Sequence, residues 1–368
     1  MNAAPALSVA AALQAPNELL PFALPQWDTL IREARQANLL SRIADGLARL
    51  GLLPCVPAAP RAHLEAALVV ANAQTEAVRR EVTYVRNALA GIDVDVVLLK
   101  GAAYLEAELP AAHGRVFSDV DILVPFCRLA EVENALVVQG WATTHHDAYD
   151  QKYYRTWMHE LPPLRHNIRM TVLDVHHAIL PRTARLKPDS AKLIAASLPV
   201  AGKDRLRVLC PADMVLHGAA HLFHNEELSQ GLRDLADLDS LLRHFGQHPD
   251  FWESLSSRAA ALDLCRPLYY ALRYAYRLMG TPVPPAALHR ANAGRPPQFI
   301  GCVMDALYRR ALLPVAPIES GSAAALARQV LYVRAHWLRM PPHMVLRHLT
   351  VKVLRRGEAR QGRAGPTG

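Results

Sequence analysis

The sequence lacks the features that mark membrane-spanning and secreted chains. None of its apolar runs reaches the roughly 18 residues that a bilayer-spanning helix needs. The stretch from residue 1 to 17 is rich in alanine but contains no Lys or Arg, whereas a signal peptide has a basic leader before its apolar segment. These absences predict a cytoplasmic protein with a frayed N-terminus.

Cysteine is scarce, and its spacing carries no disulfide or metal signature. The five cysteines are an odd number, and no two of them form a Cys-x-x-Cys pair. A disulfide framework uses an even set, and cysteine zinc sites commonly use such pairs. We therefore expect these residues to be reduced, buried thiols.

Acidic residues are nearly absent from one end of the chain. Between residues 328 and 368 there are nine Lys or Arg and one acid, Glu358, so this segment accounts for the whole net charge of +8. A basic end of this kind attracts nucleic acid or anionic lipid, or it is a solvated tail. A membrane-surface or nucleic-acid contact through the basic C-terminus therefore stays open beside simple packing and solvation of a final helix.

Hydrophobic periodicity divides the chain into helices, a small α/β unit and more helices. Apolar residues recur at helical spacing as far as Gly91 and again after Pro211, with short β-rich runs between them. The expected regions are an N-terminal helical region (1–90), a core (91–209), a C-terminal helical region (210–356) and a disordered basic tail (357–368). The expected strands are 94–99, 119–124, 141–145, 169–176 and 205–209. The expected later helices are 211–224, 228–245, 249–262, 265–279, 296–312, 323–338 and 343–355.

Three acids in the β-rich part form the main candidate site. Asp119 and Asp121 are two apart on an expected strand, so their side chains share one face. Neighbouring carboxylates repel each other unless a cation lies between them, and Mg²⁺ prefers carboxylates together with substrate phosphates. Asp174 lies on a later strand and completes a three-carboxylate cluster if the two strands pair. Such a set suits phosphoryl or nucleotidyl transfer, with Asp174 also helping to deprotonate an attacking hydroxyl.

A candidate phosphate-binding element precedes these acids. The strand that ends at Leu99 runs through Lys100 and Gly101 into a helix, whose N-terminal N–H groups favour phosphate. Gly101 lets the backbone come close to a ligand, and Lys100 and Arg115 add positive charge. With Ala102 and Ser118, these residues make up the predicted nucleotide-binding set.

These motifs resemble a known family. The segments 98–103 (LLKGAA) and 115–124 (RVFSDVDILV) resemble the Leu-Lys-Gly turn, the Arg and the Asp-x-Asp strand of the bacterial uncharacterised nucleotidyltransferases, which belong to the polymerase-β superfamily. The segments 173–176 (LDVH) and 233–238 (RDLADL) are similar to its third-acid strand and its Arg-x-x-x-Asp helix. Ala102 stands where the wider superfamily has a serine, so no hydroxyl is available there for phosphate.

The resemblance implies both a fold and a reaction. The expected fold is α+β, with a polymerase-β-like nucleotidyltransferase core that has a small mixed sheet and helical regions on both sides. Mg²⁺ or Mn²⁺ would be held by Asp119, Asp121 and Asp174, and an NTP would lie near Lys100 and Gly101. The expected reaction moves an NMP to an acceptor hydroxyl and releases pyrophosphate. The acceptor, whether small molecule, RNA or protein, is not indicated, because this fold serves many acceptors.

Other interpretations stay beside this one. The chain is alternatively a non-catalytic nucleotide-binding or assembly module on the same fold, which the missing hydroxyl at Ala102 favours. His217, His221 and His224 share one face of an expected helix, where packing and hydrogen bonding against the α/β unit compete with a cleft-lining or metal-binding role. Arg233 and Asp237 are spaced to pair along their helix.

Overall fold

The computed structural model describes residues 8–144, 147–224, 228–313 and 322–341. The predicted α+β class is confirmed, because a seven-stranded mixed sheet lies between helical regions in the order of the chain. The expected helix 343–355 and the tail 357–368 lie outside the described residues. None of the helices in the described ranges has both the length and the apolar character that crossing a membrane requires.

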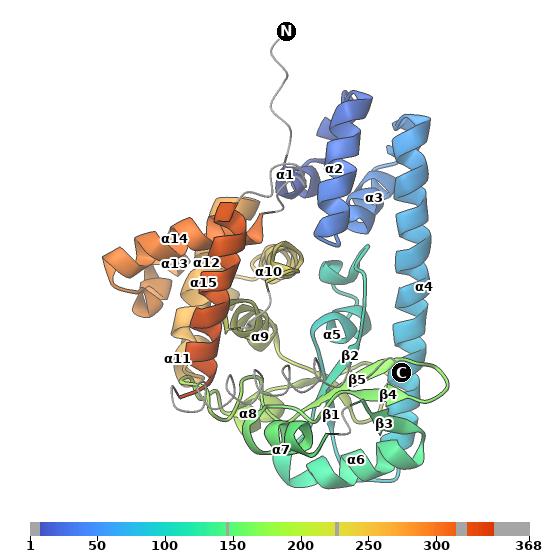
Figure 1. The fold of residues 1–368 in the computed structure, drawn as a ribbon, viewed down its shortest axis with the longest axis vertical. Coiled ribbons are helices and arrows are strands. Elements are labelled where there is room, and N and C mark those ends of the chain that lie inside the picture. The colour runs from blue at the N-terminus through green and yellow to red at the C-terminus, as the bar shows by residue number, and fades with distance from the viewer. Residues whose placement is uncertain (1–7, 145–146, 225–227, 314–321, 342–368) are drawn as a thin grey trace, which may run out of the picture.

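The N-terminal helices lead into one long helix. Pro57 precedes this helix and Pro60 lies in its first turn, where a backbone N–H has no helical partner to lose. The helix ends at Leu89, shortly before Gly91, and it runs down one side of the molecule from α2 and α3 to the sheet (Figure 1). The helices of this part are α1 (Val9–Gln14), α2 (Leu24–Gln36), α3 (Leu40–Arg49) and α4 (Ala58–Leu89).

Two predictions about the periphery were wrong. The N-terminus is not frayed from residue 8 onward, because the Ser8 side chain accepts the Ala11 N–H at 3.3 Å and caps α1. Apolar residues of α1 pack into the core. The cysteines are free, as expected, but they are not buried. Cys55, Cys127 and Cys302 are exposed, and Cys210 and Cys265 are partly buried.

The sheet has the strand order β3-β4-β5-β2-β1-β7-β6. The pairs β2–β5 and β1–β7 are parallel, and the other pairs are antiparallel. All five expected strands are present, while β4 and β6 were not anticipated. The strands are β1 (Val96–Leu99), β2 (Val120–Leu123), β3 (Trp141–Thr143), β4 (Leu164–His166), β5 (Val172–His176), β6 (Leu198–Pro199) and β7 (Leu206–Val208).

The central strands bring the chemically important side chains together. Asp121 on β2 lies opposite Leu99 on β1 and opposite Asp174 on β5. Their apolar neighbours Ile122 and Leu173 are fully buried on the other side of the sheet. Polar residues of the adjacent strands β2 and β5 therefore share one face. The helices of this part are α5 (Lys100–Glu106), α6 (Leu129–Val138), α7 (Ala148–Trp157) and α8 (Ser190–Ala195).

The C-terminal helices pack around α9, which lies between the sheet and the outer helices (Figure 1). Helix α9 contacts α5 on the sheet side and α10, α11, α12 and α15 on the other. It therefore connects the β-rich part to the rest of the molecule. The helices are α9 (Pro211–His224), α10 (Gly231–Phe245), α11 (Phe251–Ala261), α12 (Cys265–Met279), α13 (Pro285–Ala291), α14 (Gln298–Leu312) and α15 (Ser322–Arg339).

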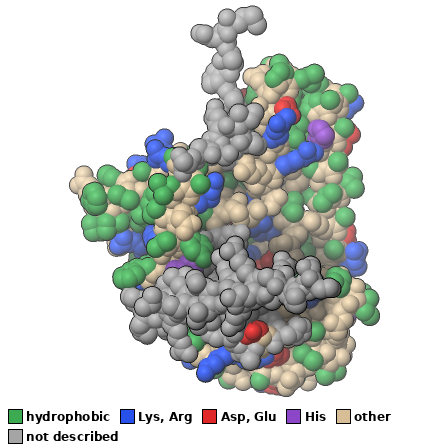
Figure 2. Space-filling view, viewed as in Figure 1, with side chains coloured by type: hydrophobic (Ala, Val, Ile, Leu, Met, Phe, Trp, Pro, Cys, Tyr) green, Lys and Arg blue, Asp and Glu red, His purple; other side chains and the backbone are tan. Residues whose placement is uncertain are grey.

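One apolar surface lies on the outer helices. Hydrophobic side chains gather at the left of the molecule, over α14 and its neighbours (Figure 2). Phe299 is 79% exposed on α14, and Leu326 and Val333 are exposed on α15. The described residues therefore leave part of these two helices uncovered.

Candidate active site

Lys100 stands at the junction of β1 and α5. Its backbone has φ +45°, a left-handed conformation that costs a residue with a Cβ about 1–2 kcal/mol. The junction aims the side chain at Asp121, and Lys100 Nζ donates a hydrogen bond to Asp121 Oδ1 at 2.9 Å. Burial alone would lower the pKa of Lys100, but Asp121 and then Asp119 raise it above its usual value. Lys100 is therefore held as a cation.

Asp121 is the centre of the cluster. It is buried, and His176 Nε2 lies 3.0 Å from the same Oδ1 that Lys100 contacts. Burial opposes ionisation, but Lys100 and His176 outweigh it and hold the pKa of Asp121 well below its usual range. Both hydrogen bonds end on Oδ1, so neither of them occupies Oδ2.

Asp174 faces Asp121 across the β2–β5 pair but has a different environment. Its Oδ1 is buried without a hydrogen-bond partner among the described residues. Burial, together with the negative charges of Asp121 and Glu160, raises the pKa of Asp174 to about 8. A buried, unpaired carboxylate oxygen is costly unless a ligand or an ion satisfies it.

Asp119 and Ser118 lie just before β2. The strand begins at Val120, one residue later than predicted, and Ser118 Oγ donates to Asp119 Oδ1 at 3.0 Å. Asp119 lines the same cavity as Lys100 and Asp174. The structure thus brings the three predicted acids and Lys100 to one place.

The remaining predicted phosphate contacts lie elsewhere. Ala102 is buried, and a Cβ on Gly101 would meet Arg115 Nη1 at 2.3 Å, so this glycine makes room for a guanidinium group. Arg115 is buried and pairs with Asp237 of α10 through Nε and Oδ2 at 3.1 Å. Arg115 does not line the cavity that holds the acids.

The pairing of Arg233 with Asp237 was predicted wrongly. Arg233 instead contacts its neighbour Asp234, with Nη2 3.0 Å from Oδ1. Asp237 binds Arg42 of α3 through Oδ1 and Arg115 through Oδ2. A long-range contact thus replaces the helical one, because two arginines from other elements reach the buried carboxylate.

A second polar group, which no motif or spacing in the sequence indicated, lies beside the acids. His159 and Glu160 follow α7, and Glu160 forms an isolated antiparallel bridge with His176. Glu160 Oε2 lies 3.3 Å from His176 Nδ1 and 3.8 Å from His159 Nε2. These residues fall between the expected strands 141–145 and 169–176, with no spacing that links them to the Asp-x-Asp motif.

A cavity of about 280 Å³ opens onto these groups. Helix α9 forms one wall with His217, His221 and His224. This face of α9 therefore lines the cavity, which was the alternative to packing and hydrogen bonding against the α/β unit. Burial, and then Lys100, hold the pKa of His217 well below its usual value. The cavity is also lined by the charged and polar residues Lys100, Asp119, Glu160, Asp174 and His176, and by Arg339 of α15.

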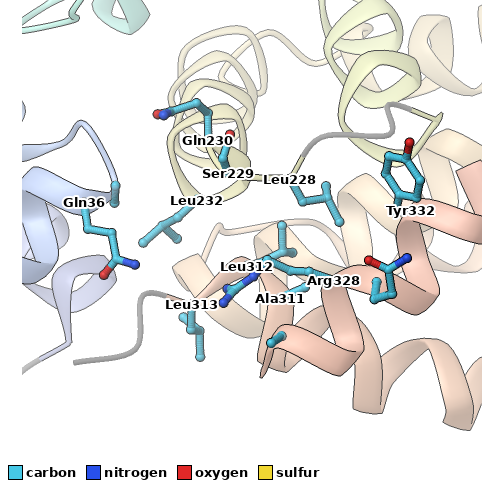
Figure 3. A pocket seen from close by; sticks show the side chains of 13 residues that line it. Gln36, Leu228, Ser229, Gln230, Leu232, Ala311, Leu312, Leu313, Arg328 and Tyr332 are labelled. Carbon is cyan, nitrogen blue, oxygen red and sulfur yellow. The ribbon is translucent and has the colours of Figure 1, made fainter. Parts of the chain in front are cut away.

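A larger cavity lies away from the acids. It measures about 510 Å³ and is lined by residues of α2, α10, α14 and α15. Leu232, Leu312 and Leu313 line it, and the Arg328 side chain extends toward Leu312 and Leu313 (Figure 3). It contains none of the predicted site residues, and no carboxylate lines it. The smaller, polar cavity is therefore the candidate active site.

Comparison with known proteins agrees with this geometry. Residues 24–280, more than two-thirds of the chain, match the family described as "Uncharacterised nucleotidyltransferase". The chain belongs to this nucleotidyltransferase family. No curated protein and no solved structure matches it. Family membership identifies the chain as a transferase of nucleotidyl groups, and the matched range includes the three acids and Lys100.

The nucleotidyltransferase site has two sets of possible metal ligands. Asp119, Asp121 and Asp174 offer oxygen atoms only, which suits Mg²⁺. The unpartnered Oδ1 of Asp174 fits an ion at this place. Among the described residues, the group whose ligand atoms all lie within 4.8 Å of one another is a different one, His159, Glu160 and His176.

Proposed function

We propose that this nucleotidyltransferase is metal-dependent and transfers an NMP from an NTP to an acceptor hydroxyl, releasing pyrophosphate. The observation that carries the proposal is the meeting of Lys100, Asp119 and Asp174 at one polar cavity. Asp121 lies directly behind them, bonded to Lys100 and opposite Asp174 in the sheet. Within a nucleotidyltransferase family, oxygen ligands next to a fixed cation are what a metal-bound triphosphate needs. We further propose that the protein works in the cytoplasm.

Each residue has a proposed role. Asp119, Asp121 and Asp174 would hold Mg²⁺ or Mn²⁺, which when bound neutralises charge on the phosphates. Lys100 has a fixed positive charge beside Asp121 and would face the phosphate oxygens. Gly101 would act indirectly, because the space it leaves for Arg115 fixes the start of α5. Ser118 would keep Asp119 oriented through its hydrogen bond.

The proposed reaction is a single displacement. The acceptor oxygen forms a bond to the α-phosphorus, the bond from that phosphorus to the bridging oxygen breaks, and pyrophosphate leaves. The hydroxyl proton goes to a carboxylate of the site, for which Asp174 is our candidate. The acceptor itself stays open among small molecules, RNA and protein.

The test is transfer of label from α-labelled ATP, GTP, CTP and UTP, with Mg²⁺ or Mn²⁺ and a cell extract as the acceptor pool. The critical variant is the double change Asp119→Asn/Asp121→Asn. The matched control is Asp28→Asn, which removes an exposed acid on α2. We expect label to move into a product with wild type and control only.

Each other outcome has its own meaning. Metal-dependent NTP binding without transfer from any nucleotide would point to an acceptor that the extract does not contain. Transfer that survives the double change would place the chemistry at other residues. The absence of both transfer and nucleotide binding would overturn the proposal.

A further inference from the structure

His159, Glu160 and His176 form a compact group beside the three aspartates, and the proposed transfer reaction assigns no role to it. Their ligand atoms all lie within 4.8 Å of one another. We infer that these three residues bind a transition-metal ion such as Zn²⁺, at a site separate from the aspartates. This inference does not depend on nucleotidyl transfer, since it concerns metal binding by the resting protein.

The spacing of the donor atoms fits a small cation. Zinc binds imidazole nitrogen at about 2.0–2.1 Å and carboxylate oxygen at about 2.0–2.2 Å, so neighbouring donors of a tetrahedral site lie about 3.3–3.5 Å apart. His176 Nδ1 and Glu160 Oε2 are already 3.3 Å apart, and His159 Nε2 is 3.8 Å from the same oxygen. These two distances therefore lie within a few tenths of an ångström of the spacing between neighbouring zinc ligands.

The ring nitrogen of His176 that faces Glu160 is available to bind a metal ion. His176 Nδ1 is buried without a hydrogen-bond partner among the described residues. The other ring nitrogen, Nε2, lies 3.0 Å from Asp121 Oδ1. Metal-binding histidines usually donate their second N–H to a carboxylate, which fixes the ring and leaves the first nitrogen free to bind. Asp121 can supply this support to His176.

The backbone holds the group in place before any ion binds. The carbonyl of His159 accepts the N–H groups of His177 at 2.8 Å and Ala178 at 3.2 Å. The N–H of Leu161 donates to the carbonyl of Val175 at 2.9 Å. The segment that bears His159 and Glu160 is thus tied to the end of β5, which bears His176. Binding would need little ordering of the chain.

An ion pair is the competing explanation of the same contacts. A protonated His176 would bridge Asp121 and Glu160, but its Nδ1 makes no hydrogen bond to Glu160 despite the 3.3 Å separation. Two imidazoles and one carboxylate suit zinc and its neighbours, whereas the all-oxygen aspartates suit Mg²⁺. The two donor sets would therefore select different ions from the same solution. A fourth ligand position would face the cavity, open to water or to an oxygen of a bound molecule.

The experiment uses full-length protein that is stripped with a chelator and titrated with Co²⁺ in excess Mg²⁺, without nucleotide. Tetrahedral or five-coordinate Co²⁺ gives intense visible absorption, whereas octahedral Co²⁺ on oxygen ligands absorbs only weakly. Elemental analysis after dialysis against Zn²⁺ gives the stoichiometry. We expect one tightly bound ion per chain, with affinity lowered by about 100-fold or more in His159→Ala and in Glu160→Gln.

Two matched variants separate this site from its surroundings. Asp119→Asn removes a carboxylate of the aspartate set, and His217→Gln removes a histidine that lines the same cavity from α9. Both should bind Co²⁺ with an affinity within about threefold of wild type. Thermal unfolding would show which variants are folded. If His159→Ala and Glu160→Gln do not fold, hyperfine-shifted ring N–H signals from two imidazoles in the Co²⁺-loaded wild type decide the matter.

The inference is overturned if stripped wild type gives no such absorption, if the shifted imidazole signals are missing, or if folded His159→Ala binds as well as wild type. Loss of the absorption in Asp119→Asn would also overturn it, because the ion would then belong to the aspartates. Nucleotidyl transfer without Co²⁺ binding would refute this inference alone. Co²⁺ binding by a protein that shows neither transfer nor nucleotide binding would leave this inference standing and refute the proposed reaction alone.

Discussion

The adjacent residues Lys100 and Gly101 lie beside two different groups of buried charged side chains, and these groups have different roles. Lys100 leads to Asp121, Asp174 and the cavity, while Gly101 makes room for Arg115 and its partner Asp237. In the first group a carboxylate oxygen of Asp174 is left without a partner. In the second, each oxygen of Asp237 has its own arginine.

The difference teaches where to look for chemistry among buried charges. A buried carboxylate that is fully paired contributes to the fold, since removing one partner leaves an uncompensated charge. A buried carboxylate with a free oxygen beside a cavity weakens the fold, and this is typical of a binding site. Lys100 and Arg115 were both predicted to contact phosphate, but their partners differ. Lys100 binds Asp121 in the first group, whereas Arg115 binds the fully paired Asp237 in the second.

The sharpest test of this contrast is Asp174→Asn. We expect transfer to fall by at least about 1,000-fold, which is about 4 kcal/mol of transition-state stabilisation. Thermal stability without metal should stay equal or rise, because the change removes a buried acid with an unpaired oxygen. Initial rates of the labelling assay and thermal unfolding measure the two effects. A large loss of stability would mean that Asp174 is structural.

Asp237→Asn should give the opposite result. It leaves Arg42 and Arg115 buried without their counter-charge, and we expect a loss of about 3–5 kcal/mol in the free energy of unfolding. The control is Asp28→Asn, which breaks an exposed pair with Arg32 and should cost about 1 kcal/mol or less. Denaturant titration compares them. Equal losses in both variants would refute the distinction.

Gly101→Ala tests the close contact beneath the second group. The added methyl meets the Arg115 guanidinium, so we expect a loss of about 1–3 kcal/mol in stability. Gly91→Ala is the control, because a Cβ there meets nothing within 4 Å, and its effect should stay within about 0.5 kcal/mol. If Gly101 instead serves only to admit a phosphate, stability would be unchanged and NTP affinity alone would fall.

His224 gives the smallest effect, on the wall of the cavity. Burial, and then Arg334 and Arg339, lower its pKa to about 3, while the unfolded chain takes up the proton below about pH 6.5. The free energy of unfolding therefore decreases by up to about 1.4 kcal/mol per pH unit as the pH falls from about 6 toward 4. His224→Gln should remove this part of the slope of unfolding free energy against pH. The same change at the exposed His289 is the control, and equal slopes in wild type and His224→Gln would contradict the assignment.

Much of the fold could be read from the sequence because periodicity and punctuation are local. The long helix follows from Pro57, Pro60 and Gly91, and the expected strands all exist. The strand β4 and the two-residue β6 escaped notice, because they are too short for an alternating pattern. Helix α1 was not predicted because its cap, Ser8, lies in an alanine-rich stretch that resembles a frayed terminus.

The sequence by itself determined the elements and the three acids, because Asp119 and Asp121 are local neighbours and Asp174 lies within its own β-rich run. Only the tertiary structure decided which charges meet. The parallel pairing of β2 with β5 set Asp121 against Asp174. The packing of α10 against the short segment Pro110–Ala112 brought Arg115 to Asp237. The bridge from Glu160 to His176 added the group that no spacing indicated. Contacts between residues far apart in the chain depend on register and packing, and neither is encoded in a local pattern.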